Sequence, residues 1–104
     1  MNRFIPICEL KRRENLVEKY TKIKEILKRN LNSKGWDGRW FKRAITDDGT
    51  EIGSISSDEC KIDSISQSWS VISNAGDNDK KFIAIEEAES HLIDKDNRII
   101  KLFD

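Results

Sequence analysis

The feature that most constrains this chain is the stretch of residues 36–73, which holds all three tryptophans. Trp36 and Trp40 flank an Asp-Gly pair, and Trp69 lies near the end of the stretch. Tryptophan carries a large apolar area, and its indole N–H needs a partner when buried, so each one calls for a core or a ligand. We expect this stretch to organise the fold, with a supporting helix before it and a helix and a strand after it.

The first half of the stretch has the pattern of a β-hairpin. From Trp40 the period changes to two, so that Trp40, Lys42, Ala44 and Thr46 alternate with Phe41, Arg43 and Ile45. Asp48-Gly49 then supplies the residue pair that tight hairpin turns favour. The pattern predicts extended segments at 39–46 and 50–52, or a long loop with hairpin character.

The second half has the pattern of an amphipathic helix. Ser56 and Glu59 have the spacing of a capping box, which predicts a helix start there. The helix should end at residues 74–76, and its apolar face should include Ile62, Ile65, Trp69 and Ile72.

Helices are also predicted on both sides of the stretch. Apolar residues three and four apart predict a helix over residues 9–32, with Gly35 closing it in the left-handed conformation. Residues 77–79 supply acidic N-cap chemistry for a helix that runs to Leu92. Residues 94–97 form a turn, and residues 98–103 form a short strand.

Composition limits this chain of 104 residues to one unit with a small core, because 37% of it is hydrophobic and 37% is charged. The formal net charge is zero, so electrostatics names no partner overall. Residues 1–35 hold ten Lys and Arg against four Asp and Glu. This basic excess fits a nucleic-acid face or a solvated helix surface, and the scarcity of interleaved aromatic residues favours the surface.

The two cysteines, Cys8 and Cys60, are too far apart in the sequence for a CxxC pair, and with His91 alone they cannot complete a zinc site. A disulfide between them is possible, although reduced thiols fit better. No apolar run approaches the roughly 20 residues of a membrane span, and the N-terminus lacks the pattern of a signal peptide. We therefore expect a cytoplasmic chain.

Several short motifs form a specific combination. They are WDGRWFKRA at 36–44, DDGT at 47–50, IGS at 52–54, ECKIDSISQSW at 59–69 and GD at 76–77. With this combination, residues 4–103 resemble the catalytic domain of the glycoside phosphorylases of glycoside hydrolase family 94, formerly grouped as glycosyltransferase family 36. That family includes cellobiose and chitobiose phosphorylases and the phosphorylase-like part of cyclic β-1,2-glucan synthase.

The resemblance implies a mainly α fold, part of an (α/α)6 barrel in which helix hairpins carry an inserted β-hairpin or long loop. It implies inverting, reversible phosphorolysis of a β-glucoside oligosaccharide, with inorganic phosphate as co-substrate and no cofactor. It also implies a structural partner, either the remainder of the barrel or a second subunit. Neither a nucleic acid nor a membrane is expected as a partner.

The chain departs from the family pattern in two places. The family's general acid lies in a GDWND-like motif before the matching region, and its phosphate-binding segments follow that region; neither motif is present here. The resemblance therefore implies that residues 1–104 are an internal piece of one catalytic domain, without catalytic residues and inactive alone. A small helical domain that binds carbohydrate or protein without catalysis is the alternative.

Four side chains are candidates for contact with a sugar. Trp36 and Trp40 have the flat apolar surface that suits sugar C–H groups, although core packing fits them equally well. Core packing fits Trp69 better, because it shares a helical face with Ile62 and Ile65. Arg43 and Gln67 have donors and acceptors for hydroxyl groups in an intact barrel. The remaining polar candidates fit structural roles: a turn for Asp37, solvated turns for Asp47 and Asp48, helix capping for Glu59 and Asp63, and a surface position for His91.

The apolar positions exceed what three helices can cover among themselves. The sequence thus predicts a contiguous exposed patch. It should include Leu16, Tyr20, Ile23, Leu27, Ile62, Ile65, Trp69, Phe82 and Leu92.

Overall fold

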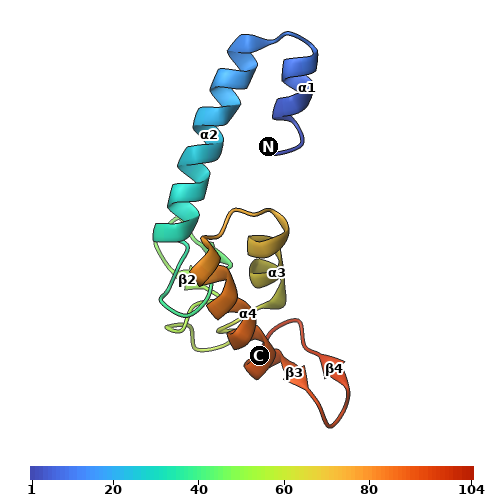
Figure 1. Ribbon diagram of the computed structural model, residues 1–104. Helices are drawn as coiled ribbons and strands as arrows, with labels where there is room; N and C mark the ends of the chain where they lie inside the picture. Colours follow the sequence, from blue (N-terminus) through green and yellow to red (C-terminus); the bar gives the residue numbers. More distant parts are fainter. The chain divides into compact units, whose positions relative to one another are not determined.

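A computed structural model describes all 104 residues, which divide into two compact units, Met1–Asn30 and Leu31–Asp104. The chain is mainly α with small two-stranded sheets, as predicted (Figure 1). Its elements are α1 (Ile5–Leu10), α2 (Glu14–Ser33), β1 (Ala44–Ile45), β2 (Glu51–Ile52), α3 (Ser64–Ile72), α4 (Asn78–Leu92), β3 (Ile93–Asp94) and β4 (Ile99–Ile100). No helix combines the length and the apolar character needed to cross a membrane.

The first unit contains α1 and the greater part of α2, where the sequence predicted one helix starting at residue 9. Pro6 lies in the first turn of α1, where its missing N–H is no loss and its fixed φ suits a helix. Arg12 then adopts a left-handed φ of 52°, and the N–H of Arg13 donates to the carbonyl of Cys8 at 2.9 Å. This closure separates the two helices and corrects the predicted start.

The second unit begins at the end of α2, which stops at Ser33 as predicted but closes differently. Gly35 does not adopt a positive φ. A Cβ at this position would lie 2.7 Å from the carbonyl oxygen of Leu31, so glycine is needed here for space. The carbonyl of Gly35 accepts the N–H of Lys42 at 2.8 Å, which starts the following loop.

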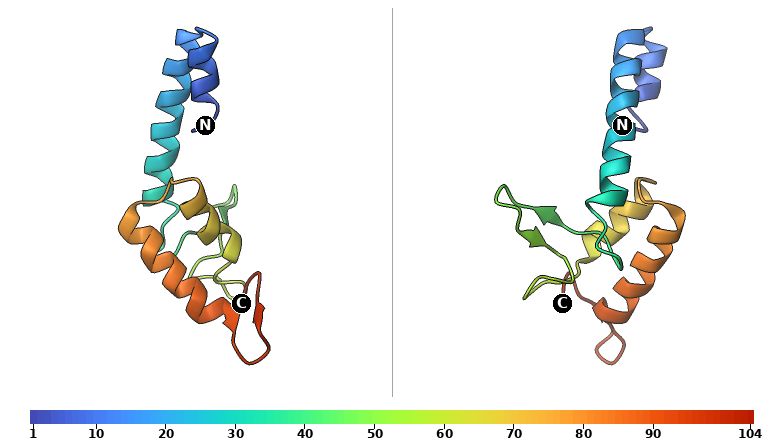
Figure 2. Two further views of the ribbon diagram at one scale, coloured as in Figure 1. Left: turned by 45° about the vertical axis from the view of Figure 1, so that its right-hand side comes forward. Right: turned by 90° about the vertical axis from the view of Figure 1, so that its left-hand side faces the viewer.

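The predicted hairpin is present. β1 and β2 pair antiparallel, with Ala44 opposite Ile52 and Ile45 opposite Glu51. The hairpin extends away from α3 and α4 in the right-hand view of Figure 2. Gly49 has a φ of 88°, which explains why the turn lies at the Asp-Gly pair.

Helix α3 starts five residues after the predicted capping box ends. Its N-cap is Asp63, whose Oδ1 accepts the N–H of Ser66 at 2.8 Å. The hydroxyl of Ser56 instead lies 3.4 Å from the carboxylate of Glu51, within a loop. The capping-box prediction was therefore wrong, because Ser56 is used by the loop, while the prediction that Asp63 caps a helix is confirmed.

The C-terminal segment returns to the start of α3. Helix α4 follows its predicted N-cap, Asp77, and leads into β3, which pairs antiparallel with β4. The N–H of Ser64 then donates to the carbonyl of Leu102 at 2.8 Å, and the N–H of Ile62 donates to Asp104 Oδ1 at 3.1 Å. The predicted final strand therefore exists, with part of its length attached to the segment before α3.

The core of the second unit is small. It is built from Trp40, Phe41, Ile62, Ala84 and Leu92, with Leu31, Trp36 and Ala88 packed against it. Of the nine side chains predicted to be exposed, Ile62 and Leu92 are buried, and Leu27, Ile65, Trp69 and Phe82 are exposed. Trp69 is 59% exposed, which agrees with the predicted patch and contradicts the expected core packing beside Ile62.

Candidate functional site

The candidate site is the loop of residues 36–57, the 36–57 loop, which contains the hairpin and most of the predicted site residues. Asp37 holds its first turn. Its Oδ1 accepts the N–H groups of Arg39 and Trp40, each at 3.0 Å, and its Oδ2 accepts the N–H of Ile55 at 2.9 Å. One carboxylate thus joins both ends of the loop, confirming the predicted turn role of Asp37.

The side chain of Trp40 points from the loop into the core of the second unit. It is 2% exposed, and its indole N–H donates to the carbonyls of Lys61 at 2.8 Å and Gly53 at 3.2 Å. Trp40 therefore has no free ring face on which a sugar could stack. Its role in this structure is to support the loop.

Gln67 is buried completely and links α3 to the loop. Its Oε1 accepts the N–H of Phe41 at 2.8 Å, and its Nε2 donates to the carbonyl of Phe41 at 3.0 Å. Nε2 also donates to the carbonyl of Asp63 at 3.0 Å. The amide is thus occupied by the backbone, and a sugar hydroxyl could reach it only after the loop moved.

The side chains of Trp36 and Arg43 are open to solvent in part. Trp36 is half-buried, with its ring edge-on to Phe41 at 4.9 Å between centroids. The Arg43 side chain is 49% exposed, and its Nη1 lies 2.9 Å from Oδ2 of the buried Asp63. These two predicted residues keep surface available for a ligand, and both belong to the same loop.

A second ion pair ties the loop to α4. The guanidinium of Arg39 makes a bidentate contact with Glu87, at 2.7–2.9 Å, and lies over the Trp40 ring at 5.4 Å. His91 lies one turn further along α4, with its ring 5.5 Å from that of Trp40. Sequence analysis missed Glu87, because a lone glutamate on a charged helix carries no signal of a partner 48 residues away.

The carboxylate of Glu51 lies among donors on the hairpin side of the loop. It pairs with Lys42, and its Oε2 accepts the hydroxyl of Ser54 at 2.9 Å. Hydrogen bonds from Lys42 and then Ser54 hold the pKa of Glu51 below its ordinary value. At the hairpin turn, a hydrogen bond from Thr46 likewise lowers the pKa of Asp48. These hydrogen bonds therefore stabilise the ionised form of both carboxyl groups.

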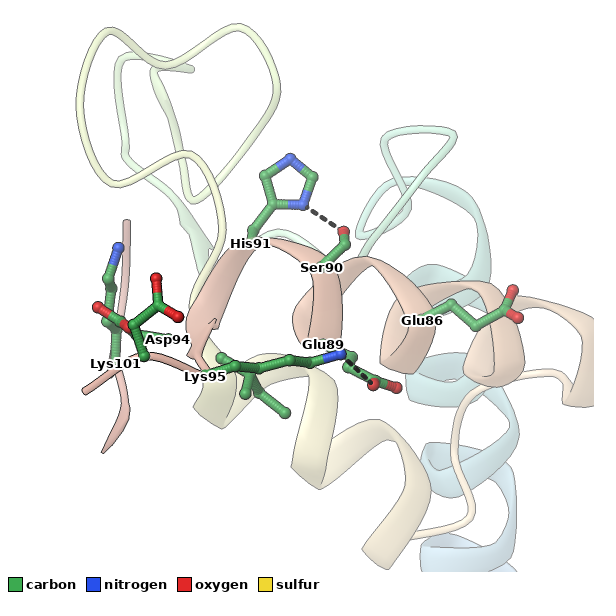
Figure 3. A pocket seen from close by; sticks show the side chains of 9 residues that line it. Glu86, Glu89, Ser90, His91, Asp94, Lys95 and Lys101 are labelled. Atoms are coloured by element: carbon green, nitrogen blue, oxygen red, sulfur yellow. Dashed lines mark hydrogen bonds and ion pairs between the residues drawn. The ribbon is translucent and has the colours of Figure 1, made fainter. Parts of the chain in front are cut away.

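A separate hollow lies at the end of α4 and beside the β3–β4 hairpin (Figure 3). Its carboxylates and amines partly pair with each other, as in Lys95 with Glu89 at 3.9 Å, and His91 points away from that pair. Hydrogen bonds from Asn97 lower the pKa of Asp94. None of its side chains belongs to the predicted sugar site.

Comparison with known proteins places this arrangement in a family. Residues 1–102 match the family described as the Glycosyl hydrolase 94 superfamily, catalytic domain. The chain belongs to this family, which confirms the resemblance seen in the motifs.

Curated relatives share the match. The chain is 37% identical over 100 residues to the cyclic beta-(1,2)-glucan synthase NdvB of Rhizobium meliloti, covering 96% of this chain and 4% of that protein. It is 28% identical over 92 residues to the cellobionic acid phosphorylase of Neurospora crassa, covering 88% and 12%. It is 29% identical over 84 residues to the solabiose phosphorylase of Paenibacillus borealis, covering 81% and 11%. The chain thus spans a small part of each relative.

Proposed function

We propose that this chain is a segment of a carbohydrate-active catalytic domain of the inverting glycoside phosphorylase or glycosyltransferase-36 type. In the parent domain, an (α/α)6 barrel, it acts on β-linked glucosides with inorganic phosphate as co-substrate. The carrying observation is the 36–57 loop, which is anchored on α3 by Gln67 and on α4 by Glu87 and presents Trp36 and Arg43 at its surface. A sugar site needs such a preorganised loop, because flexible groups lose binding energy on ordering.

Burial and the state of the cysteines make the proposal more specific about residue roles and about the compartment. Trp36 and Arg43 are the direct contacts, while Trp40 and Gln67 position the loop from below. The free thiols Cys8 and Cys60 favour a reducing compartment, and the proposal places the protein in the cytoplasm.

We further propose that residues 1–104 alone do not turn over substrate. An inverting attack on a glycoside needs a carboxylic acid that keeps its proton until the leaving oxygen takes it. Three carboxylates of the loop and its supports instead accept hydrogen bonds from N–H groups: Asp37 from backbone amides, Asp63 from Arg43, and Glu51 from Lys42. Because these three are engaged as acceptors, none of them is free to present a proton to the leaving oxygen.

The test is a pair of measurements on the purified chain. We expect no release of glucose 1-phosphate from cellobiose or β-1,2-glucan, because removing one general acid alone costs about 10²–10⁴-fold in rate. We expect weak binding of the same glucans, seen as shifts of the backbone amide resonances of the 36–57 loop and abolished by Trp36→Ala. Trp69→Ala is the matched control, since Trp69 is exposed outside the loop. Turnover that survives both Trp36→Ala and Asp37→Asn would refute the assignment.

A second candidate is a small binding domain without catalysis. The many exposed large apolar side chains outside the loop favour protein interaction for such a domain. This alternative would be favoured if Trp36→Ala bound glucan as tightly as the unchanged chain does.

A further inference from the structure

Arg43, one of the two side chains that the 36–57 loop offers to a sugar, has a buried counter-ion. Its Nη1 donates to Oδ2 of Asp63 at 2.9 Å, and the Asp63 side chain is 2% exposed. Asp63 is fixed in place, because its Oδ1 accepts the N–H of Ser66 at 2.8 Å as the N-cap of α3. The charge of Arg43 is thus compensated, while its guanidinium has further N–H donors for an uncharged acceptor.

The other two cations of the loop are compensated in the same way. Arg39 makes its bidentate contact with Glu87, and Lys42 pairs with Glu51. In its sequence the loop holds three Lys and Arg against four Asp and Glu. Asp63 and Glu87 add two negative charges at its supports. The loop and its supports therefore carry a net negative charge, although each of the three cations has a partner.

This arrangement of charges separates neutral sugars from sugar acids. A sugar hydroxyl needs only single hydrogen bonds, which Arg43 can donate from its exposed part, and the ring of Trp36 suits sugar C–H groups. A carboxylate on the sugar would compete with Asp63 for Arg43, and one of the two anions would lose its partner. It would also meet the negative charge of the loop, and like charges brought together oppose binding.

We propose that the 36–57 loop selects neutral glucosides against sugar acids, with Asp63 and Glu87 as specificity-determining residues that neutralise Arg43 and Arg39. This inference rests on the proposed function, because it assumes that a sugar binds at the loop. It narrows the substrate class from β-linked glucosides in general to those that carry no carboxylate where they meet the loop.

The test compares three ligands of similar size on the full chain of 104 residues. They are cellobiose, its uronic acid analogue, in which one C6 hydroxymethyl group is oxidised to a carboxylate, and the methyl ester of that acid. Backbone amide resonances of the 36–57 loop report binding at low ionic strength. We expect the acid to bind about 10-fold more weakly than cellobiose, because like charges repel. The ester should bind about as tightly as cellobiose, because it is neutral again.

Two variants remove the counter-ions. Asp63→Asn leaves Arg43 with an uncompensated charge and keeps an acceptor oxygen for the cap of α3. Glu87→Gln frees the charge of Arg39 without touching that cap, so it tests the proposal even if Asp63→Asn unfolds. Each should bring the affinity for the acid to within about 3-fold of that for cellobiose. Glu86→Gln is the matched control, because Glu86 is the exposed neighbouring glutamate on α4 and lines the separate hollow.

Salt provides a measurement that needs no substitution. Raising the ionic strength from about 0.01 M to about 0.15 M shortens the screening length from about 30 Å to about 8 Å. The difference in affinity between the acid and cellobiose should therefore shrink in the unchanged chain, while the affinity for cellobiose should stay the same.

Equal or tighter binding of the acid by the unchanged chain would overturn this inference and leave the proposed function standing. An ester that binds as weakly as the acid would also overturn it, since size and not charge would then decide. A difference that persists in the folded variants and at the higher salt concentration would do the same. Binding of none of the three ligands would refute the proposed function, and this inference with it.

Discussion

In the 36–57 loop, Trp40 is 2% exposed and its indole N–H reaches two carbonyl oxygens, whereas Trp69 on α3 is 59% exposed. The sequence places Trp40 in a predicted hairpin segment and Trp69 on the apolar face of a predicted helix. The spacing of apolar residues is more regular around Trp69. The difference follows from hydrogen bonding. An irregular loop leaves backbone groups that need partners, and α3 meets that need with its polar side. In this unit, the backbone of the loop decides which face of α3 is buried.

The largest expected effect comes from exchanging the two tryptophans for alanine. Trp40→Ala should lower the free energy of unfolding by about 3–5 kcal/mol, because it empties the centre of a small core. Trp69→Ala should change it by less than about 0.5 kcal/mol, as at other exposed positions. Urea unfolding followed by circular dichroism measures both values. Equal losses would show that α3 packs with its apolar face inward in solution.

The next effect concerns the amide that joins α3 to the loop. Gln67→Met keeps the volume of the side chain but leaves the N–H and the carbonyl of Phe41 unpaired. We expect a loss of about 2–6 kcal/mol, from two buried polar groups at about 1–3 kcal/mol each. Ser68→Ala, at the exposed neighbouring position, serves as the control. If the urea midpoint of Gln67→Met equals that of the unchanged chain, hydrogen bonding by Gln67 does not set the orientation of α3.

A smaller effect is expected at the first turn of the loop. Asp37→Asn replaces one acceptor oxygen with an NH₂ group, so either Ile55 or the Arg39–Trp40 pair loses its partner. We expect a loss of about 1–2 kcal/mol. Hydrogen exchange should quicken at the loop amides and stay unchanged in α4. The control is Asp47→Asn at an exposed turn position, and uniform exchange across the unit would contradict a local role for Asp37.

The smallest effect is a pH dependence at Glu51. Because folding lowers its pKa, ionised Glu51 contributes its full stability above the pKa of the unfolded chain. That contribution is lost as the pH falls through the lower, folded-state pKa. Glu51→Gln should therefore flatten the acid side of the stability curve, measured by urea unfolding from neutral to acid pH. A curve as steep as that of Asp58→Asn, the exposed control, would argue against this linkage.

The sequence was informative where local chemistry decides the structure. Asp48-Gly49 located the hairpin, Asp37 was expected to hold a turn, and Asp63 was expected to cap a helix. Each depends on partners within a few residues or on backbone conformations that few side chains adopt. The family resemblance likewise depended on a combination of short local motifs.

The sequence misled where distant partners decide the structure. Apolar periodicity assigned Trp69 to the core, since periodicity carries no information on whether Gln67 is needed elsewhere. For the same reason the sequence showed no sign of Glu87, whose partner Arg39 lies 48 residues earlier. It also led to a helix start predicted at Ser56, whereas α3 begins at Ser64. Of the predicted site, Trp36 and Arg43 lie at the surface together on the loop, and the positions of Trp40 and Gln67 required the full set of contacts.

The anchors of the 36–57 loop also determine the order in which the unit can assemble. The partner of Phe41 is Gln67, 26 residues later in the chain, and the partner of Arg39 is Glu87, 48 residues later. A ribosome releases the loop before either anchor, so the loop emerges without its partners. The α3–α4 hairpin, whose helices are close in sequence, should therefore form first and serve as the template onto which the loop closes. Translation that pauses before residue 87 would hold the nascent chain in a state where the indole of Trp40 is still accessible to chaperones.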